Sequence, residues 1–533
     1  MKLRFIIGTA QAVLAAAPAV AGPDDAALAR IVDEGLNRSQ AMTTASELMD
    51  GIGPRLTNSP NFYKAEEWAK ARMQAIHLAN VHAESFPFGT GWSVGDYHAA
   101  MTAPRRLPLT AIPVAWSPST NGVISAPIVV APMSKAENFA AWRGKLAGKI
   151  VLVSLPGATA EPDKPFFRRL DDGEIAKLDS YSLPSYDPEN FARQAERRVF
   201  TKQLSDFLKA EGAAAMVRIA YRDGMLVSGE GSGFVPSQAI ALPFFEFAAE
   251  DYRRLVRLAQ TGTAPTVELK ADTTFDTARL TSDNIFGEIP GTDPKAGYVM
   301  AGAHFDSWIA GDGASDNGAG SVAVLEAARI LSSLGIRPRR TIRFALWSGE
   351  EQGLIGSKAY IDSHLAHRPL PAGSDPADWT AWGNAWPIQP LAGYNQLKAY
   401  FNLDNGSGKI RGIYAEGNVA AAPLLRDWLG PFKSMGAGAV VMQKTGGTDH
   451  VFIQAVGIPG YQFVQDPLDY GSRVHHSNLD TVDHMRADDM RQAATVIAGM
   501  LWQAANSDKE LPRGPVPTRP APTDPFKVKD PNE

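Results

Sequence analysis

The amino-acid sequence predicts an α/β protein in which a mostly parallel mixed sheet is sandwiched by helices and a β-rich domain is inserted into the chain. Three short apolar runs, at residues 298–303, 341–347 and 397–403, have the length and composition of buried strands. The first two are separated by a segment with apolar side chains at helical spacing. Between residues 103 and 272 the pattern changes to short strands and turns. Because strands that alternate with helices form open, mostly parallel sheets, these patterns predict the main fold.

The helices follow in chain order. Residues 26–83 are expected to be helical and to pack on the main sheet. The helix between the first two strands places Val324 and Leu331 on one face, and Gly335 is suited to end it. The last helix is expected at residues 487–505, with an extended Pro-rich tail beyond it.

Five polar runs in the second half of the chain each offer a metal ligand. The runs are HFDSW, GASDNGAG, WSGEE, NLDNGSG and VHHSNLDT, and their candidate ligands are His304, Asp316, Glu351, Asp404 and His476. Three of these ligands lie at or just past the carboxyl ends of expected strands, where open α/β sheets bind their ligands. Any one run is most simply a loop with an ordinary polar residue. Their order and spacing together predict a site for two divalent ions roughly 3.5–4 Å apart.

Asp316 is the natural bridge between the two ions, because small residues surround it in a glycine-flanked turn. Glu351 and His476 then complete one ion, and His304 and Asp404 complete the other. Imidazole and carboxylate ligands without thiolate predict two Zn²⁺ ions, with Co²⁺ or Mn²⁺ as substitutes.

Glu350 remains as a carboxylate next to a ligand but not itself one. A general base needs that position, because it must reach the reacting water without binding a metal. Asp306, two residues after His304, is placed to orient that imidazole, and Asp480 is placed to do the same for His476.

These motifs resemble those of the co-catalytic zinc aminopeptidase and glutamate carboxypeptidase family, which includes bacterial leucyl aminopeptidases, plasma glutamate carboxypeptidase and the transferrin receptor. The resemblance covers most of the mature chain. It includes GIGPR at residues 51–55, FPFG at residues 86–89, and GIP at residues 457–459 after Asp449 and His450. It implies a zinc exopeptidase fold, the ligand assignment above and Glu350 as general base.

The resemblance also implies three finer features. The peptide bond after the bridging aspartate, Asp316–Asn317, is expected to be cis. His475 is the less favoured member of the His-His pair, because the metal histidine of the family precedes Ser or Thr. The family uses a Tyr hydroxyl to stabilise the tetrahedral intermediate, and here Tyr470 is a weak candidate, with His450 as the alternative.

Residues 103–272 resemble a protease-associated domain, a module that several relatives carry as an insertion. Such a domain either covers one side of the active-site cleft or is an appendage without substrate contact, and both remain open. Its residues 158–198 are polar and predict a surface excursion. The tryptophan-containing stretch at residues 369–390 is expected to pack on its own domain, with a substrate pocket or a subunit contact as alternatives.

Length and resemblance together predict more than one domain, since 533 residues exceed one ordinary core. The expected division is a signal peptide at 1–21, the N-terminal part of the peptidase domain at 22–102, the insert at 103–272, the zinc peptidase catalytic domain at 273–508 and a tail at 509–533.

The N-terminus has the features of a secretory signal peptide. Lys2 and Arg4 precede an apolar stretch at residues 5–17, and Ala-Val-Ala precedes Gly22, which predicts cleavage after Ala21. The apolar stretch is too short for a stable membrane span. The chain contains 0 cysteines and therefore uses no disulfides. We expect a secreted or periplasmic protein.

The function predicted from these features is an exported di-zinc aminopeptidase that removes N-terminal residues from peptides. A carboxypeptidase or dipeptidase of the glutamate carboxypeptidase type is the alternative; it needs a cation cluster for carboxylates, and Arg473 is the only conspicuous cation near the motifs. A glutaminyl cyclase-like transferase with one zinc ion and a metal-free receptor-like binding protein are more remote. A net charge of −5 without a basic cluster argues against a nucleic-acid partner, and the oligomeric state is left open.

Overall fold

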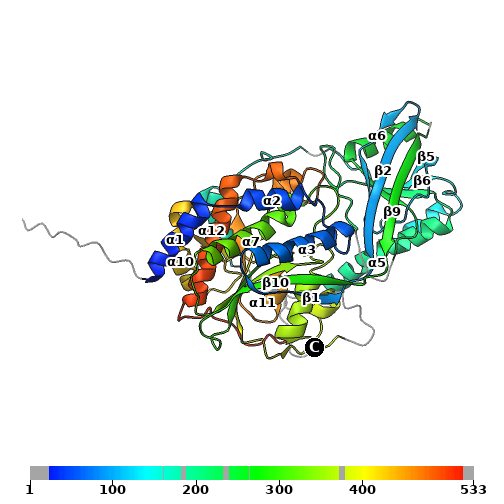
Figure 1. The fold of residues 1–533 in the computed structure, drawn as a ribbon. Coiled ribbons are helices and arrows are strands. Elements are labelled where there is room, and N and C mark those ends of the chain that lie inside the picture. The colour runs from blue at the N-terminus through cyan, green and yellow to red at the C-terminus, as the bar shows by residue number, and fades with distance from the viewer. Residues whose placement is uncertain are drawn as a thin grey trace, which may run out of the picture.

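The computed structural model describes residues 23–159, 161–181, 188–231, 239–262, 264–370 and 379–519. The expected signal peptide and the last part of the expected tail lie outside these ranges. Figure 1 shows a large body, which contains both α1 and α12, and a smaller body built around the long strands β2 and β9. Each body contains one eight-stranded sheet. None of the described helices is long and apolar enough to cross a membrane.

The large sheet has the order β1-β10-β12-β11-β15-β18-β16-β17. Its strands are β1 (Ala79–Pro87), β10 (Thr281–Ile289), β11 (Tyr298–His304), β12 (Thr341–Trp347), β15 (Leu397–Asn402), β16 (Ile410–Tyr414), β17 (Ala439–Val441) and β18 (Gly460–Gln465). The central strands β12, β11, β15 and β18 are parallel, whereas β1, β10 and β12 pair antiparallel, as do β16 and β18. The predicted mixed, mostly parallel sheet is confirmed, and β11, β12 and β15 are the three apolar runs.

Helices cover both faces of this sheet. The helices of the large body are α1 (Pro23–Asn37), α2 (Ala41–Met49), α3 (Pro60–Ala75), α7 (Ala319–Ser333), α8 (Ile355–Tyr360), α9 (Trp379–Gly383), α10 (Ala422–Leu429), α11 (His450–Ala455) and α12 (Ala487–Asn506). On one face, α1, α2, α3, α7 and α12 share a core with the strands, and on the other Tyr360 of α8 and Phe452 of α11 pack against Trp347 and Tyr400. The sheet is therefore buried on both sides, which explains why its central strands are mainly apolar.

Helix α7 has the expected position, and Gly335 has a φ of +60° just beyond its end, a conformation that glycine adopts without strain. One expectation for the N-terminal helices is wrong. Residues 79–83 belong to β1 rather than to a helix, because α3 ends at Ala75 and the chain then pairs antiparallel with β10. Pairing with a neighbouring strand overrides the weak local pattern there.

The second sheet has the order β3-β2-β9-β5-β6-β7-β8-β4. The strands of this sheet are β2 (Gly91–Ala103), β3 (Leu107–Pro108), β4 (Ala111–Pro113), β5 (Ile124–Val130), β6 (Ile150–Leu152), β7 (Ala215–Ile219), β8 (Phe244–Phe247) and β9 (Thr266–Asp276). The helices of the same body are α4 (Asp172–Leu178), α5 (Pro188–Ala210) and α6 (Ala249–Gln260). The chain enters this body through β2 and leaves it through β9, and these two strands pair antiparallel. This body spans residues 91–276, a wider range than the 103–272 expected from the sequence, because β2 and β9 lie largely or partly outside those bounds; we call residues 91–276 the insert. Its sheet has its own apolar core, with Ile150, Val217 and Phe247 among the buried residues.

The short elements are the two-stranded pair β13 (Ala366–His367) and β14 (Gln389–Pro390), and the short 3-10 and π helices η1 (Ala136–Trp142), η2 (Ala314–Gly318), η3 (Ile361–Leu365), η4 (Gly430–Met435), η5 (Tyr470–Val474) and η6 (Val482–His484). In the tryptophan-containing stretch, Trp382 is buried and its Nε1 donates a hydrogen bond to Asp362 (3.2 Å). Arg368 lies over the rings of Trp382 and Trp386, 4.5 and 4.6 Å from their centroids. The described part of this stretch therefore packs on its own domain.

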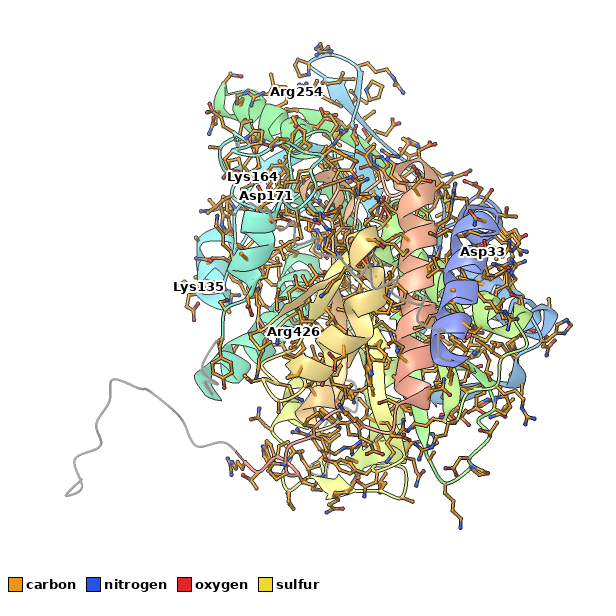
Figure 2. All side chains as sticks on the ribbon, turned by 90° about the vertical axis from the view of Figure 1, so that its left-hand side faces the viewer. Asp33, Lys135, Lys164, Asp171, Arg254 and Arg426 are labelled. Carbon is orange, nitrogen blue, oxygen red and sulfur yellow. The ribbon has the colours of Figure 1, made fainter. Side chains whose placement is uncertain are left out.

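The polar excursion of the insert contacts the large body. Arg169 forms ion pairs with Asp466 (2.9 Å) and Asp489 (2.8 Å), and the backbone N–H of Arg168 donates to the carbonyl of Leu468 (2.9 Å). Asp171, labelled in Figure 2, caps the following helix α4 by accepting a hydrogen bond from the backbone N–H of Glu174 (2.7 Å). The excursion is therefore anchored beside η5 of the large body.

Candidate metal centre

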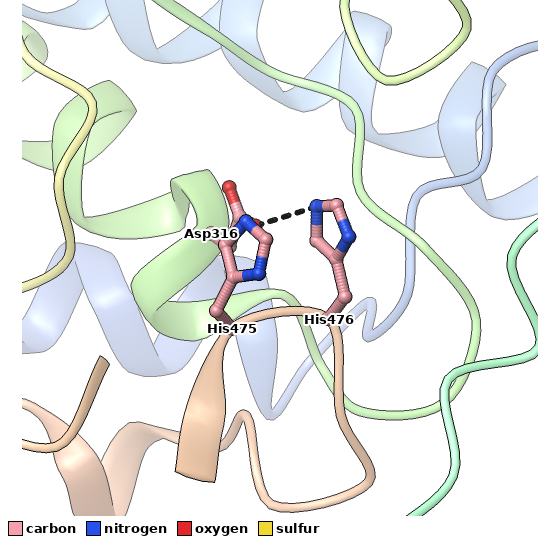
Figure 3. A group of neighbouring side chains, drawn as sticks. All are labelled: Asp316, His475 and His476. Carbon is pink, nitrogen blue, oxygen red and sulfur yellow. Dashed lines mark ion pairs between the residues drawn. The ribbon is translucent and has the colours of Figure 1, made fainter. Parts of the chain in front are cut away.

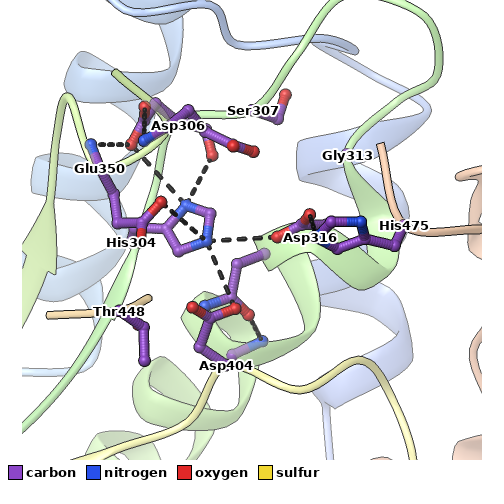
Figure 4. Close-up of polar contacts among 12 residues, drawn as sticks. His304, Asp306, Ser307, Gly313, Asp316, Glu350, Asp404, Thr448 and His475 are labelled. Carbon is purple, nitrogen blue, oxygen red and sulfur yellow. Dashed lines mark hydrogen bonds and ion pairs between the residues drawn. The ribbon is translucent and has the colours of Figure 1, made fainter. Parts of the chain in front are cut away.

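The predicted site residues lie at the carboxyl end of the large sheet. His304 is the last residue of β11, Glu350 follows β12 by three residues, and Asp404 follows β15 by two. Asp316 lies in η2, the turn that leads into α7. Figure 4 shows these side chains converging from different segments of the chain. The three strands are neighbours in the sheet, so their ends bring together residues that are far apart in the sequence.

Asp316 lies between two groups of candidate ligands. Its Oδ1 is 3.3 Å from Nε2 of His304, which is itself 3.4 Å from Oδ1 of Asp404. Its Oδ2 is 3.0 Å from Nε2 of His476, which is also 3.0 Å from Oε2 of Glu351. The two oxygens of one carboxylate thus face different histidines, which is the arrangement that a bridging ligand requires.

His475 also approaches this centre, with Nε2 3.6 Å from Oδ2 of Asp316. Its ring stacks on that of His476, with a centroid distance of 3.8 Å and an interplanar angle of 19°. Figure 3 shows both rings beside Asp316. His476 is the better placed of the two, because its side chain is 18% exposed against 38% for His475 and because it alone of the pair also contacts Glu351 among the described residues.

Donor chemistry and charge both fit divalent cations. Among the described residues, Oδ2 of Asp316 and Oε1 of Glu351 are buried atoms without a hydrogen-bond partner. Burial raises the pKa of Glu351 to about 7, and it raises the pKa of Asp449 nearby to about 7 as well. A cluster of buried carboxylates has an excess of negative charge that bound cations offset.

The turn that carries Asp316 is held by side chains from distant segments. The Asp316–Asn317 peptide bond is cis, as the resemblance implied. Nδ2 of Asn317 donates to the carbonyl of Leu403 (2.9 Å). Asp480, predicted to orient His476, instead accepts hydrogen bonds from the backbone N–H groups of Ser315 (2.6 Å) and Asp316 (3.0 Å). Asp480 thus positions Asp316 through its backbone.

Asp306 has two roles in the structure. Its backbone carbonyl, rather than its carboxylate, is the nearer acceptor for Nδ1 of His304, at 3.0 Å against 3.7 Å. The carboxylate accepts hydrogen bonds from the backbone N–H groups of Glu350 (3.2 Å) and Glu351 (3.3 Å) and from the hydroxyl of Thr57 (3.0 Å). Asp306 therefore fixes both the imidazole and the turn that carries the paired glutamates.

Glu350 faces the site without the close histidine contact that Glu351 makes. Its Oε2 is 3.9 Å from Nε2 of His304, and the side chain is almost completely buried. Burial raises the pKa of Glu350 well above its ordinary value, although the nearby His304 acts in the opposite direction. A buried carboxyl group with a raised pKa is suited to accept and return a proton.

A cavity of about 370 Å³ opens onto these residues. Besides the predicted ligands and Glu350, it is lined by Gly353, Leu354, Asn405, Gly446, Gly447, Thr448, Tyr470 and His475. Burial raises the pKa of Tyr470 well above its ordinary value, so its hydroxyl remains protonated. His450 lies away from the lining, where its Nε2 is 2.9 Å from the hydroxyl of Thr445 and 3.2 Å from Glu416.

Sequence reasoning did not identify Glu230 of the insert. Its Oε1 is 2.8 Å from Nδ1 of His476, although the two residues are 246 positions apart in the chain. Glu230 lies in a glycine-rich run without a metal-site pattern, so the sequence offers no signal that connects it with the histidine.

Comparisons with known proteins found matches in sequence and in fold. Residues 284–501 match a family described as peptidase family M28. Mouse (Mus musculus) carboxypeptidase Q is 26% identical over 470 residues, which cover 87% of this chain and 86% of that protein. A peptidase M28 precursor from Shewanella amazonensis SB2B has a solved structure with 24% identity and a TM-score of 0.67, covering 93% of this chain and 100% of its own. The structure of BSAP, a zinc aminopeptidase from Bacillus subtilis, has 20% identity and a TM-score of 0.55, covering 88% of this chain and 95% of its own.

Proposed function

Residues 284–501 of this chain belong to peptidase family M28, and on that premise we propose that the chain is a di-zinc aminopeptidase. The observation that carries the proposal is the position of Asp316, whose two carboxylate oxygens face His304 and His476 separately. We assign Asp316, His304 and Asp404 to one ion, and Asp316, Glu351 and His476 to the other. Carboxylate and imidazole donors without thiolate match zinc.

Zinc ions bound there would lower the pKa of water and polarise the carbonyl group of a peptide bond. In the proposed reaction Glu350 takes the proton from the attacking water and returns it to the nitrogen of the leaving amine. Tyr470 lines the same cavity with a protonated hydroxyl, which we propose donates a hydrogen bond to the carbonyl oxygen as negative charge develops on it. Asp306 keeps the backbone of Glu350 and Glu351 in place during this exchange.

The lining of the cavity favours action at the amino end of a peptide. Among the residues that the structure describes, the lining contains carboxylates but neither lysine nor arginine. A carboxypeptidase needs such a cation for the terminal carboxylate of its substrate. Arg473, the one cation singled out in the sequence, lies outside this lining with its guanidinium over the ring of Phe166, 5.6 Å from the centroid. Acidic groups suit a free α-amine instead.

A carboxypeptidase or dipeptidase activity is the second candidate, because the similarity to carboxypeptidase Q extends over 87% of this chain. Rates on an aminoacyl anilide and on an N-blocked dipeptide separate the two candidates. An aminopeptidase cleaves the first and leaves the second intact, whereas the reverse result establishes the carboxypeptidase. A dipeptidase cleaves only a dipeptide with both ends free, so failure to cleave the anilide, the N-blocked dipeptide and a free dipeptide, with zinc bound, would contradict both candidates.

We propose export on the evidence of the first 21 residues, which have the charged, apolar and small-residue regions of a signal peptide. Sequencing the N-terminus of protein recovered from the periplasm or medium tests this. A mature chain that begins at Gly22 supports cleavage after Ala21, and an intact Met1 contradicts it. The resemblance of the insert to a protease-associated domain likewise remains a prediction.

A further inference from the structure

The insert contacts the metal centre through a carboxylate. Oε1 of Glu230 lies 2.8 Å from Nδ1 of His476, the ring nitrogen that faces away from Asp316. An ionised carboxylate accepts hydrogen bonds but cannot donate them, so Nδ1 must carry the hydrogen. Nε2 then presents its lone pair toward Asp316 and Glu351, each 3.0 Å away. This contact selects the tautomer and the ring orientation that metal binding requires.

The other metal histidine obtains the same support from its own strand end. Nδ1 of His304 lies 3.0 Å from the backbone carbonyl of Asp306, and a carbonyl is also an acceptor only. His304 therefore depends on a residue two positions away, whereas His476 depends on a residue of the insert.

The segment that carries Glu230 is built to hold it in place. Arg218 donates to the backbone carbonyl of Glu230 (2.8 Å) and forms an ion pair with Glu246 (2.6 Å). Gly229 has a φ of +66°, and a Cβ at Gly231 would lie 2.7 Å from the ring of Trp116. Only glycine satisfies both positions without displacement of the neighbours, so the chain on either side of Glu230 is closely fitted.

A second set of contacts ties the same segment to the residues after His476. The backbone N–H of Val227 donates to Oδ1 of Asn478, and the backbone N–H of Asn478 donates to the carbonyl of Val227, both at 3.1 Å. The hydroxyl of Tyr221 donates to the carbonyl of His475 (3.2 Å), which Arg222 also contacts. The insert thus holds the His475–Asn478 loop at several points, with Glu230 at the metal ligand.

We propose that Glu230 is the positioning residue for His476, and that the insert is consequently an integral part of one of the two metal sites. The inference rests on the proposed two-metal function. It adds that the ion bound by Asp316, Glu351 and His476 depends on the insert, whereas the ion bound by Asp316, His304 and Asp404 does not.

The test compares zinc binding by full-length wild-type protein, Glu230→Ala, Glu230→Gln and the control Glu268→Ala. Glu268 is a matched control, because it also contacts a histidine on the insert, His98 (3.1 Å), but lies outside the metal centre. Each protein is stripped of metal and titrated with zinc against a competing chelator, and the thermal unfolding of the metal-free form is recorded in parallel.

We expect Glu230→Ala to weaken one of the two zinc sites about 10- to 100-fold and to leave the other at its wild-type affinity. Glu230→Gln keeps an acceptor oxygen, so its loss should be smaller than that of Glu230→Ala. The unfolding midpoint of metal-free Glu230→Ala should match that of Glu268→Ala.

Wild-type affinity at both sites of Glu230→Ala would overturn the proposal, as would equal weakening of both sites together with a lowered unfolding midpoint. A wild-type protein that binds no zinc would instead refute the proposed function, so the two failures are distinguishable.

Discussion

The carboxylate of Asp480 accepts a hydrogen bond from the backbone N–H of Asp316, with 3.0 Å between nitrogen and Oδ2. It accepts a second from the backbone N–H of Ser315, and together these bonds hold the turn that carries Asp316. The candidate centre therefore depends on a pair of acidic residues of which only Asp316 is a proposed metal ligand.

Replacing Asp480 by Asn should lower the occupancy of both metal positions. The amide presents one oxygen and one NH₂ group where two backbone N–H groups require acceptors, so the turn carrying Asp316 shifts. Metal content after gel filtration measures the effect. Asp362→Asn is the control, because Asp362 also accepts a hydrogen bond from a backbone N–H, that of Arg368 (3.0 Å), but does not line the cavity. Full metal occupancy in Asp480→Asn would show that the turn carrying Asp316 keeps its conformation without these two hydrogen bonds.

Glu350→Gln should reduce kcat by about 10²- to 10⁴-fold, since an amide of the same shape cannot take up a proton. Metal content should remain near that of the wild type, because we assign Glu350 no ligand role. Both quantities are measured on the same preparation. Loss of metal along with activity would mean that Glu350 maintains the site rather than moving a proton.

Tyr470→Phe should reduce kcat by about 10²- to 10³-fold with little change in KM, because the hydroxyl is needed most when negative charge develops on the carbonyl oxygen. The ring and its contact with His475, at 4.9 Å between centroids, remain. Steady-state kinetics on an aminoacyl anilide measure both constants. A raised KM at unchanged kcat would assign Tyr470 to substrate binding instead.

Stability should fall in acid partly through Glu34 on α1. Burial raises the pKa of Glu34, but hydrogen bonds from Arg38 and Arg329 outweigh it and hold the pKa below its ordinary value of 4.5. The folded state therefore favours the ionised form. The contribution of Glu34 to stability is complete above the pKa that this residue has in the unfolded chain. It is lost as the pH falls through the lower pKa of Glu34 in the folded state.

Glu34→Gln should accordingly lower the free energy of unfolding by roughly 1 kcal/mol at pH 7 and by progressively less below about pH 4. Urea unfolding at several pH values provides the comparison. Glu67→Gln, which removes an exposed partner of Lys70, should leave stability unchanged within a few tenths of a kcal/mol. If the difference in unfolding free energy between Glu34→Gln and wild type grew as the pH fell, the folded state would raise the pKa of Glu34 rather than lower it.

Much of the fold, and the gathering of the predicted site residues at one edge of the sheet, could be predicted because both depend on local patterns. Strands β11, β12 and β15 are mainly apolar runs; His304 ends the first, and Glu351 and Asp404 follow the other two at short intervals. Parallel strands place their carboxyl ends at one edge of the sheet, so local order is enough to bring these ligands together.

The residues that support the ligands could not be predicted in the same way. Glu230 reaches His476 only because the insert folds against the large body, and Asp480 contacts the backbone, which carries no sequence signal. Likewise β1 forms because β10 is there to pair with it, against the helical expectation for residues 79–83. Each of these contacts is long-range and is decided by tertiary packing.

The most direct test of the account is the zinc content per chain of Asp316→Ala compared with wild type. It is measured by mass spectrometry on purified protein that has been reloaded with zinc. Because Asp316 is assigned to both ions, we expect two zinc ions per wild-type chain and reduced occupancy at both positions in the variant. Two ions retained in Asp316→Ala would contradict the bridging role and with it the proposed centre.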